Sequence, residues 1–111
     1  MIRSATQIDR PTNPIRVLVV DDDRRVASGT AQWLCSLGWH ATAVGRVEDA
    51  LPLLARESYA ACIVDGLLAG GGAGRIAAHL RLSPVYTGLV ITVPEHAAAA
   101  AMALVEPDSI V

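Results

Sequence analysis

Apolar and polar residues alternate along the chain in a pattern that predicts both strands and helices. Short runs of apolar and β-branched residues, of a length that suits buried strands, are separated by segments with apolar residues at helical spacing. The strand-like runs cover 17–20, 39–44, 59–65 and 89–93. The helical patterns cover 24–37, 46–57 and 75–82. This alternation predicts right-handed crossovers and an α/β fold, a doubly wound parallel sheet with helices on both faces.

The two ends of the chain differ from this central pattern. Residues 95–105 have strong helix propensity from alanine, and residues 107–111 resemble the start of a fifth strand that is not completed. Residues 1–14 contain two prolines and lack the apolar core of a secretion signal, so we expect a flexible leader there. With 52% apolar residues, positions 15–111 are expected to form one globular domain that is incomplete at its C-terminal end.

The core is expected to contain large apolar side chains of the first helix and both tryptophans, Trp33 and Trp39. Cys35 and Cys62 belong to no CxxC or Cys/His cluster, which disfavours a zinc site and favours buried thiols in a reducing cytosol. The residues of the first helix expected to face the sheet are Val26, Thr30, Trp33, Leu34 and Leu37.

The charge of the chain narrows the possible partners. Its net charge is −2, its nine basic residues are all arginines, and it contains no lysine. Without a basic stripe the chain is a poor candidate for direct nucleic-acid binding, because that affinity comes largely from neutralising phosphates. No stretch has the length of a membrane span. We therefore expect a cytoplasmic protein that binds neither nucleic acid nor membrane directly.

Carboxylates follow two of the predicted strands directly. Asp21, Asp22 and Asp23 end the first strand, and Asp65 ends the third. A strand order of 2-1-3-4 would bring these two ends together, at the edge where open α/β sheets bind ligands. An oxygen-only ligand set favours magnesium or calcium, and a sparse set favours magnesium. The alternative is that the carboxylates are helix caps and solvated loop residues, and Asp23 is expected to be the N-cap of the first helix.

These features resemble the receiver domain of two-component response regulators. The likeness covers residues 15–105 and consists of the acidic pair Asp21 and Asp22, Asp65 placed 43 residues after Asp22, and a short strand ending near Val93. The resemblance implies a flavodoxin-like three-layer sandwich with strand order 2-1-3-4 and an incomplete fifth strand.

The resemblance also implies a chemistry and a set of partners. Asp65 would accept a phosphoryl group from a sensor histidine kinase or a phosphotransfer protein, and the chain would control an output domain outside it, with a homodimer as a possibility. Magnesium would be held by Asp21, Asp22, Asp65 and the backbone carbonyl of Leu67, and the backbone N–H of Gly66 would be free to face the phosphate. The domain would accept and lose phosphate and would not otherwise be an enzyme.

The chain departs from the receiver pattern at two places. Val93 stands where receiver domains carry a threonine or serine, and Thr92 lies one residue early, on the opposite face of the strand unless a bulge corrects the register. The lysine that pairs with the phosphate in receiver domains is not among residues 1–111, which end one to a few residues short of where it would fall, and whether it lies beyond Val111 stays open. A degenerate receiver that acts as a protein-interaction module is therefore the alternative function.

Two further readings are weaker. One alternative is a magnesium-dependent phosphatase or related hydrolase. The stretch VVDDDRRV counts against it, because a third carboxylate stands where the DxDx[TV] motif of such enzymes has its spacing residue. Residues 67–74, LLAGGGAG, lack the lysine and spacing of a phosphate-binding loop and are expected to form a flexible loop before the third helix.

Overall fold

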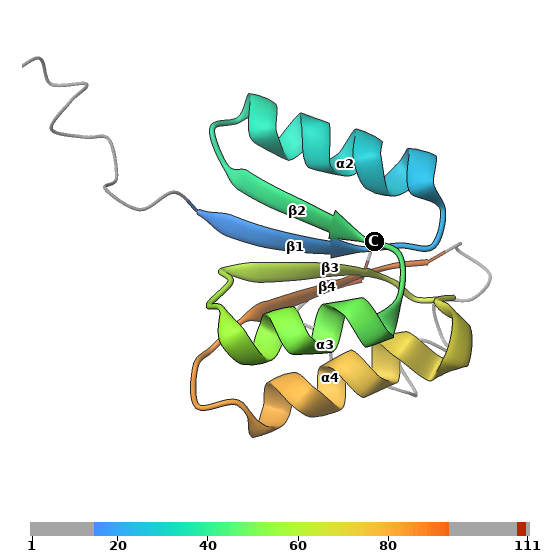
Figure 1. The fold of residues 1–111 in the computed structure, drawn as a ribbon, viewed down its shortest axis with the longest axis vertical. Coiled ribbons are helices and arrows are strands. Elements are labelled where there is room, and N and C mark those ends of the chain that lie inside the picture. Colours follow the sequence, from blue (N-terminus) through green and yellow to red (C-terminus); the bar gives the residue numbers. More distant parts are fainter. Residues whose placement is uncertain (1–14, 94–108, 111) are drawn as a thin grey trace, which may run out of the picture.

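A computed structural model describes residues 15–93 and 109–110 as a parallel sheet with helices on both faces (Figure 1). The strands are β1 (Arg16–Val20), β2 (His40–Val44), β3 (Ala61–Asp65), β4 (Gly88–Thr92) and β5 (Ser109–Ile110). The helices are α2 (Arg24–Ser36), α3 (Val47–Arg56) and α4 (Gly72–Leu82), with a single 3₁₀ turn, η1 (Ala69–Gly71).

The strand order is β2-β1-β3-β4-β5, and every neighbouring pair is parallel. This confirms the doubly wound fold, and the predicted fifth strand pairs with β4. Figure 1 shows α2 on one face of the sheet and α3 and α4 on the other. The register places Val20 opposite both Val44 and Val64, so β1, β2 and β3 end level with one another.

Most of the core lies between the sheet and the pair α3 and α4. Alternate strand residues such as Leu18, Val64 and Ile91 are fully buried on that face, against Ala50 and Ile76 of the two helices. Burial of each such large side chain stabilises the fold by about 1.5–3 kcal/mol. The opposite face carries a smaller cluster, whose buried members are Val17, Val19, Ala27 and Leu34.

Helix α2 faces the sheet differently from the prediction. Ala27 and Leu34 are buried, but Trp33 is 62% exposed, and Val26 and Leu37 are half exposed. Trp39 is 36% exposed, so the assignment of both tryptophans to the core is wrong. Ala27 and Leu34 pack with the strand residues of the smaller cluster, while the bulkier Trp33 lies on the outer surface of the helix.

Helix α4 begins at Gly72, three residues before the predicted start, so the loop prediction is wrong for residues 72–74. Gly72 is buried against Leu68, and a Cβ at position 72 would lie 2.9 Å from Leu68 Cγ. Gly70 and Gly71 have φ values of 70° and 66°, which glycine adopts without strain. Close packing by glycine thus outweighs its low helix propensity.

The remaining predicted elements agree with the described residues to within about two positions. Helix α3 continues through Pro52, and β3 begins at Ala61 rather than at residue 59. The predicted leader, residues 1–14, and the predicted helix, residues 95–105, lie outside the described residues. Within the described part, no helix is long and apolar enough to cross a membrane.

The two cysteines differ in exposure. Cys62 of β3 is fully buried, and burial raises the pKa of its thiol to about 12. Cys35 of α2 is exposed, so the prediction that both thiols are buried is wrong for this one. The sequence contains only these two cysteines.

We predict that iodoacetamide at about pH 8 modifies only Cys35 in the native protein, because the buried Cys62 is neither ionised nor accessible. Intact-mass spectrometry should show one adduct in buffer and two after denaturation in urea. Cys35→Ser should give no adduct in buffer. Two adducts in native buffer would contradict the burial of β3.

Candidate functional site

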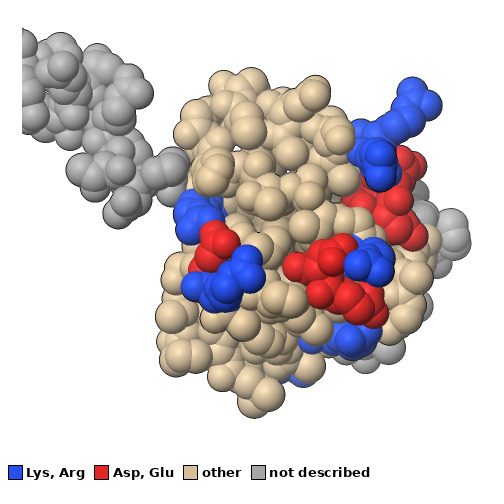
Figure 2. Space-filling model, in the orientation of Figure 1, with Lys and Arg blue, Asp and Glu red and all other residues tan. Residues whose placement is uncertain are grey.

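The carboxylates of Asp21, Asp22 and Asp65 meet at the carboxyl edge of the sheet. One oxygen of each lies within 4.8 Å of the others. β1 and β3 are parallel neighbours with Val20 opposite Val64, so the residues that follow Val20 and Val64 are brought to the same place. Figure 2 shows acidic side chains gathered at this edge, next to arginines. The predicted juxtaposition is therefore present, while the ligand roles of these residues remain predictions.

Backbone hydrogen bonds orient the acidic side chains. Asp23 is the N-cap of α2, as predicted, and its Oδ1 accepts from the backbone N–H groups of Arg25 and Val26 at 3.0 and 3.3 Å. Asp21 Oδ1 accepts from the N–H of Asp23 at 2.9 Å. Asp65 Oδ1 accepts from the N–H of Leu67 at 3.0 Å. Each of these carboxylates is thus oriented by the turn that follows it.

Asp21 is the most buried of the three carboxylates, at 9% exposure. Burial raises the pKa of its carboxyl group, the hydrogen bond from the Asp23 N–H lowers it, and the negative charge of Asp65 raises it further. The net direction is upward. The ionised cluster is therefore electrostatically unfavourable by itself, and a bound cation would relieve it.

Two cavities open beside Asp22. One, of about 440 Å³, lies between the first turn of α2 and the turn after β2, and its lining includes Asp21, Asp22, Arg24 and Arg46. The other, of about 240 Å³, shares Asp22 and Arg46 and is bounded on its far side by Leu68. A ligand can thus approach Asp22 from both sides. Neither Arg24 nor Arg46 was expected at the site from the sequence, although Arg24 directly follows the acidic run.

Ion pairs connect the elements that surround these cavities. Arg46 donates to the two carboxylate oxygens of Asp49 at 3.0 and 3.1 Å. Arg75 of α4 donates to Glu48 of α3 at 3.3 Å. These pairs are exposed and contribute little to stability, but they offset the charges of both arginines.

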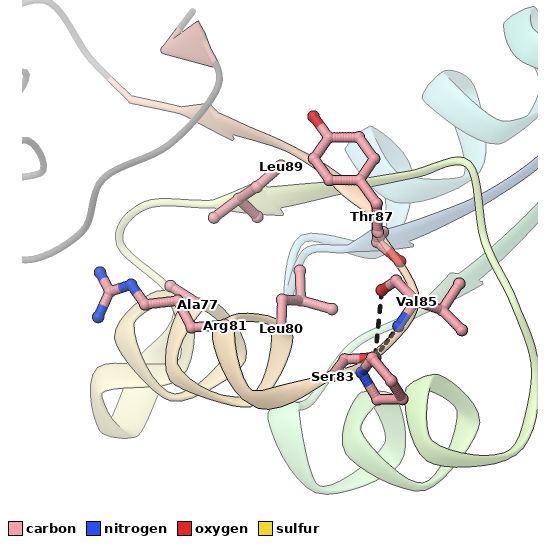
Figure 3. Close-up of a pocket in the computed structure, with 9 residues that line it drawn as sticks. Ala77, Leu80, Arg81, Ser83, Val85, Thr87 and Leu89 are labelled. Atoms are coloured by element: carbon pink, nitrogen blue, oxygen red, sulfur yellow. Dashed lines mark hydrogen bonds between the residues drawn. The ribbon is translucent and has the colours of Figure 1, made fainter.

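A third cavity, of about 390 Å³, lies at the opposite edge of the sheet, where the chain turns from α4 into β4 (Figure 3). Its lining includes Ala77, Leu80, Arg81 and Leu89 and contains no carboxylate. The turn is held by Ser83, whose Oγ accepts from the N–H of Val85 and donates to its carbonyl. This cavity is not part of the carboxylate site.

The structure at the end of β4 bears on the predictions for Val93 and for the backbone N–H of Gly66. Asp65 pairs with Thr92, and Val93 follows the strand and packs with Ile91 on the α3 and α4 side. The N–H of Gly66 donates to the Thr92 carbonyl at 2.8 Å, so the expectation that it is free is wrong in this structure. The acceptor of this hydrogen bond belongs to Thr92, the last residue of β4. The sequence alone does not show that this residue lies beside Gly66.

Val93 also touches the position that follows Asp65. A Cβ built on Gly66 would lie 2.9 Å from Ile91 Cγ2 and closer still to a methyl group of Val93. The valine therefore occupies the space that a side chain at position 66 would need. The part of Leu67 in the site, through its backbone carbonyl, remains a prediction.

Comparison with solved structures identifies the fold. A response regulator from Chloroflexus aurantiacus superposes with a TM-score of 0.77 at 22% identity, covering 89% of this chain and 84% of that one. A response regulator protein from Thermotoga maritima in complex with Mg²⁺-BeF has a TM-score of 0.73 at 21% identity, covering 87% and 84%.

A response regulator protein from Burkholderia pseudomallei with a phosphorylated aspartic acid, a calcium ion and citrate has a TM-score of 0.71 at 23% identity, covering 86% of this chain and 58% of that one. No protein-family model and no curated protein matches the sequence. The described chain therefore has the fold of response-regulator receiver domains.

The carboxylate cluster has the chemistry of a site for a hard divalent cation. All donors that the three side chains offer are oxygens, as magnesium and calcium prefer. Magnesium ligands lie about 2.1 Å from the ion, so two of them on opposite sides are about 4.2 Å apart. The observed spacing within 4.8 Å thus needs only small side-chain adjustments or a bridging water. The residues present fit the ion.

We predict that Gly66→Ala lowers the free energy of unfolding by about 1–3 kcal/mol, because the new Cβ overlaps Val93 and Ile91. The cost should be smaller in a Val93→Ala background, which removes the nearer methyl groups. Urea unfolding of the four proteins measures this difference. Gly74→Ala is a suitable control, because its Cβ meets open space on α4 and should stabilise slightly. Equal costs of Gly66→Ala in both backgrounds would contradict the contact.

We predict that Asp21→Asn raises the Tm of the metal-free protein at about pH 7 by roughly a few degrees. A carboxyl group with a raised pKa stabilises the fold while protonated and loses that contribution as pH rises through its folded pKa. The gain should therefore shrink towards about pH 4, where Asp21 itself takes up a proton.

Calorimetry in the presence of a chelator provides the Tm values. Asp49→Asn is the matched control, because Arg46 holds the pKa of Asp49 below its ordinary value and this change should not raise the Tm. A lower Tm for Asp21→Asn at neutral pH would contradict a raised pKa of the Asp21 carboxyl group.

Proposed function

We infer that the chain is a phosphoacceptor regulatory domain that receives a phosphoryl group on Asp65. The observation that supports this most directly is the placement of Asp65 beside Asp21 and Asp22, with oxygens within 4.8 Å, at the carboxyl edge of a receiver fold. A carboxylate nucleophile can take a phosphoryl group, and two further carboxylates beside it supply ligands for the cation that such transfer requires.

In the proposed step, a carboxylate oxygen of Asp65 attacks the phosphorus of a phosphohistidine. The new O–P bond forms as the P–N bond breaks, and the imidazole leaves with the bonding electron pair and takes a proton from water. Asp65 Oδ1 is oriented by the N–H of Leu67, which leaves its second oxygen for attack. Magnesium bound by the three carboxylates would offset the negative charge of the phosphoryl oxygens.

The proposal implies partners of a defined kind. A phosphohistidine donor belongs to a sensor histidine kinase or a phosphotransfer protein. The phosphorylated chain would in turn control an output domain that lies outside the given sequence. Such a donor would place the chain in the cytoplasm, and a homodimer remains a prediction. The chain would act as an acceptor and not as an enzyme that turns over a separate substrate.

A second candidate function is a degenerate receiver that binds partners without a phosphorylation switch. The observation that favours it is Val93, which follows β4 without a hydroxyl group and packs on the core side. The two candidates differ in whether Asp65 takes a phosphoryl group at all.

We predict that the protein incubated with magnesium and phosphoramidate gains the mass of one phosphoryl group, and that Asp65→Asn does not. The asparagine side chain keeps the shape of the site but is a far poorer nucleophile. Intact-mass spectrometry detects the adduct, and peptide mapping assigns it. Phosphorylation of Asp65→Asn would place the acceptor elsewhere, and an unmodified wild-type protein would favour the degenerate receiver.

Magnesium titrations by calorimetry accompany this test. Asp22→Asn should abolish magnesium binding and slow phosphorylation, while Asp23→Asn should leave both nearly unchanged. The second variant removes the same charge one position later, at a cap that asparagine also provides. Equal effects of the two changes would indicate general electrostatics and no defined ligand.

A further inference from the structure

An unpaired arginine lines the cavity beside the carboxylates. Arg24 is the first residue of α2, and the lining of the 440 Å³ cavity includes Arg24 and Ser28 together with Asp21 and Asp22. Arg24 and Ser28 are four positions apart, so both lie on the side of the helix that faces the cavity. Among residues 15–93 and 109–110, the Arg24 guanidinium makes no ion pair and no hydrogen bond.

Two other arginines of this edge are already engaged. Arg46 lines the same cavity but is held by Asp49 through two hydrogen bonds, and Arg75 is paired with Glu48. Of the two arginines that line the 440 Å³ cavity, Arg24 is therefore the one that no carboxylate of the described residues pairs with.

A phosphorylated site would need a second cation. A phosphoryl group on Asp65 together with Asp21 and Asp22 carries roughly four negative charges, and one divalent ion offsets about two of them. None of residues 1–111 is a lysine, so within them arginine and histidine side chains are the available cations. Of the described histidines, His40 begins β2 and His79 lies in the last turn of α4, so both are at the opposite edge of the sheet.

We propose that Arg24 is the phosphoryl-binding cation of this site and donates hydrogen bonds from its guanidinium to the phosphoryl oxygens during and after transfer to Asp65. This inference rests on the proposed phosphoacceptor function. The planar guanidinium presents paired N–H donors that match two oxygens of a phosphate group. The Ser28 hydroxyl faces the same cavity and offers a further donor.

The proposal predicts opposite effects of one substitution on two ligands. Arg24→Gln removes a positive charge beside the carboxylates, so magnesium should bind as well as before or more tightly. The same change should weaken beryllofluoride, a mimic of the phosphoryl group, by about tenfold at saturating magnesium, since a charge-assisted hydrogen bond is lost. Calorimetric titrations of each ligand measure both affinities without any turnover.

Arg25→Gln is the matched control. It removes the same charge from the next residue, whose side chain is not among those that line the cavity. It should change beryllofluoride affinity by no more than about twofold. Arg24→Lys keeps the charge but not the planar donors, so it should recover part of the affinity that Arg24→Gln loses.

The outcomes separate this inference from the proposed function. If Arg24→Gln weakens magnesium and beryllofluoride alike, Arg24 has a structural role and the inference is overturned. Equal beryllofluoride affinities of Arg24→Gln and Arg25→Gln would also overturn it, while the wild-type adduct on Asp65 would leave the proposed function standing. A wild-type protein that neither takes a phosphoryl group nor binds beryllofluoride with magnesium would refute both.

Discussion

Repulsion among three carboxylates is the constraint around which the carboxyl edge of this sheet is built. The parallel neighbours β1 and β3 place Val20 opposite Val64. The pairing brings one oxygen each of Asp21, Asp22 and Asp65 within 4.8 Å of the others. Two backbone N–H groups, from the residues at positions 23 and 67, each donate to one of these side chains. Asp22 remains exposed to water, which screens its charge. These contacts reduce the electrostatic cost without removing it.

The fold tolerates this cost because its stability comes from elsewhere. The larger core cluster lies between the strands and the pair α3 and α4, and it is built from side chains such as Leu18, Ile76 and Ile91 that have no contact with water. Asp65 is the last residue of β3 and the other two carboxylates follow β1, so all three lie at the carboxyl edge and outside that core cluster. A carboxylate cluster with an unfavourable charge distribution can thus be placed on a stable sheet.

The sequence predicted the strands and their order better than the faces of the helices. Continuous apolar runs ending in Asp21 and Asp65 have few alternatives to buried parallel strands, and the site residues follow from the strand order. Helix α2 has apolar residues around half of its surface, and spacing alone does not show that Ala27 rather than Trp33 faces the sheet. The bond from Gly66 to Thr92 depends on how β3 and β4 pair, a contact between distant segments that no local pattern contains.

Val93 and Arg24 together determine which element of the fold a phosphoryl group on Asp65 would contact. The Val93 side chain cannot hydrogen-bond to phosphate, so it would gain no such contact that differs between the two states of Asp65. A phosphoryl group held by Arg24 would contact the first turn of α2, next to its cap at Asp23. Helix α2 also carries the exposed Trp33 on its outer surface. If Arg24 holds the phosphoryl group as proposed, the element that would distinguish the two states is the first turn of α2.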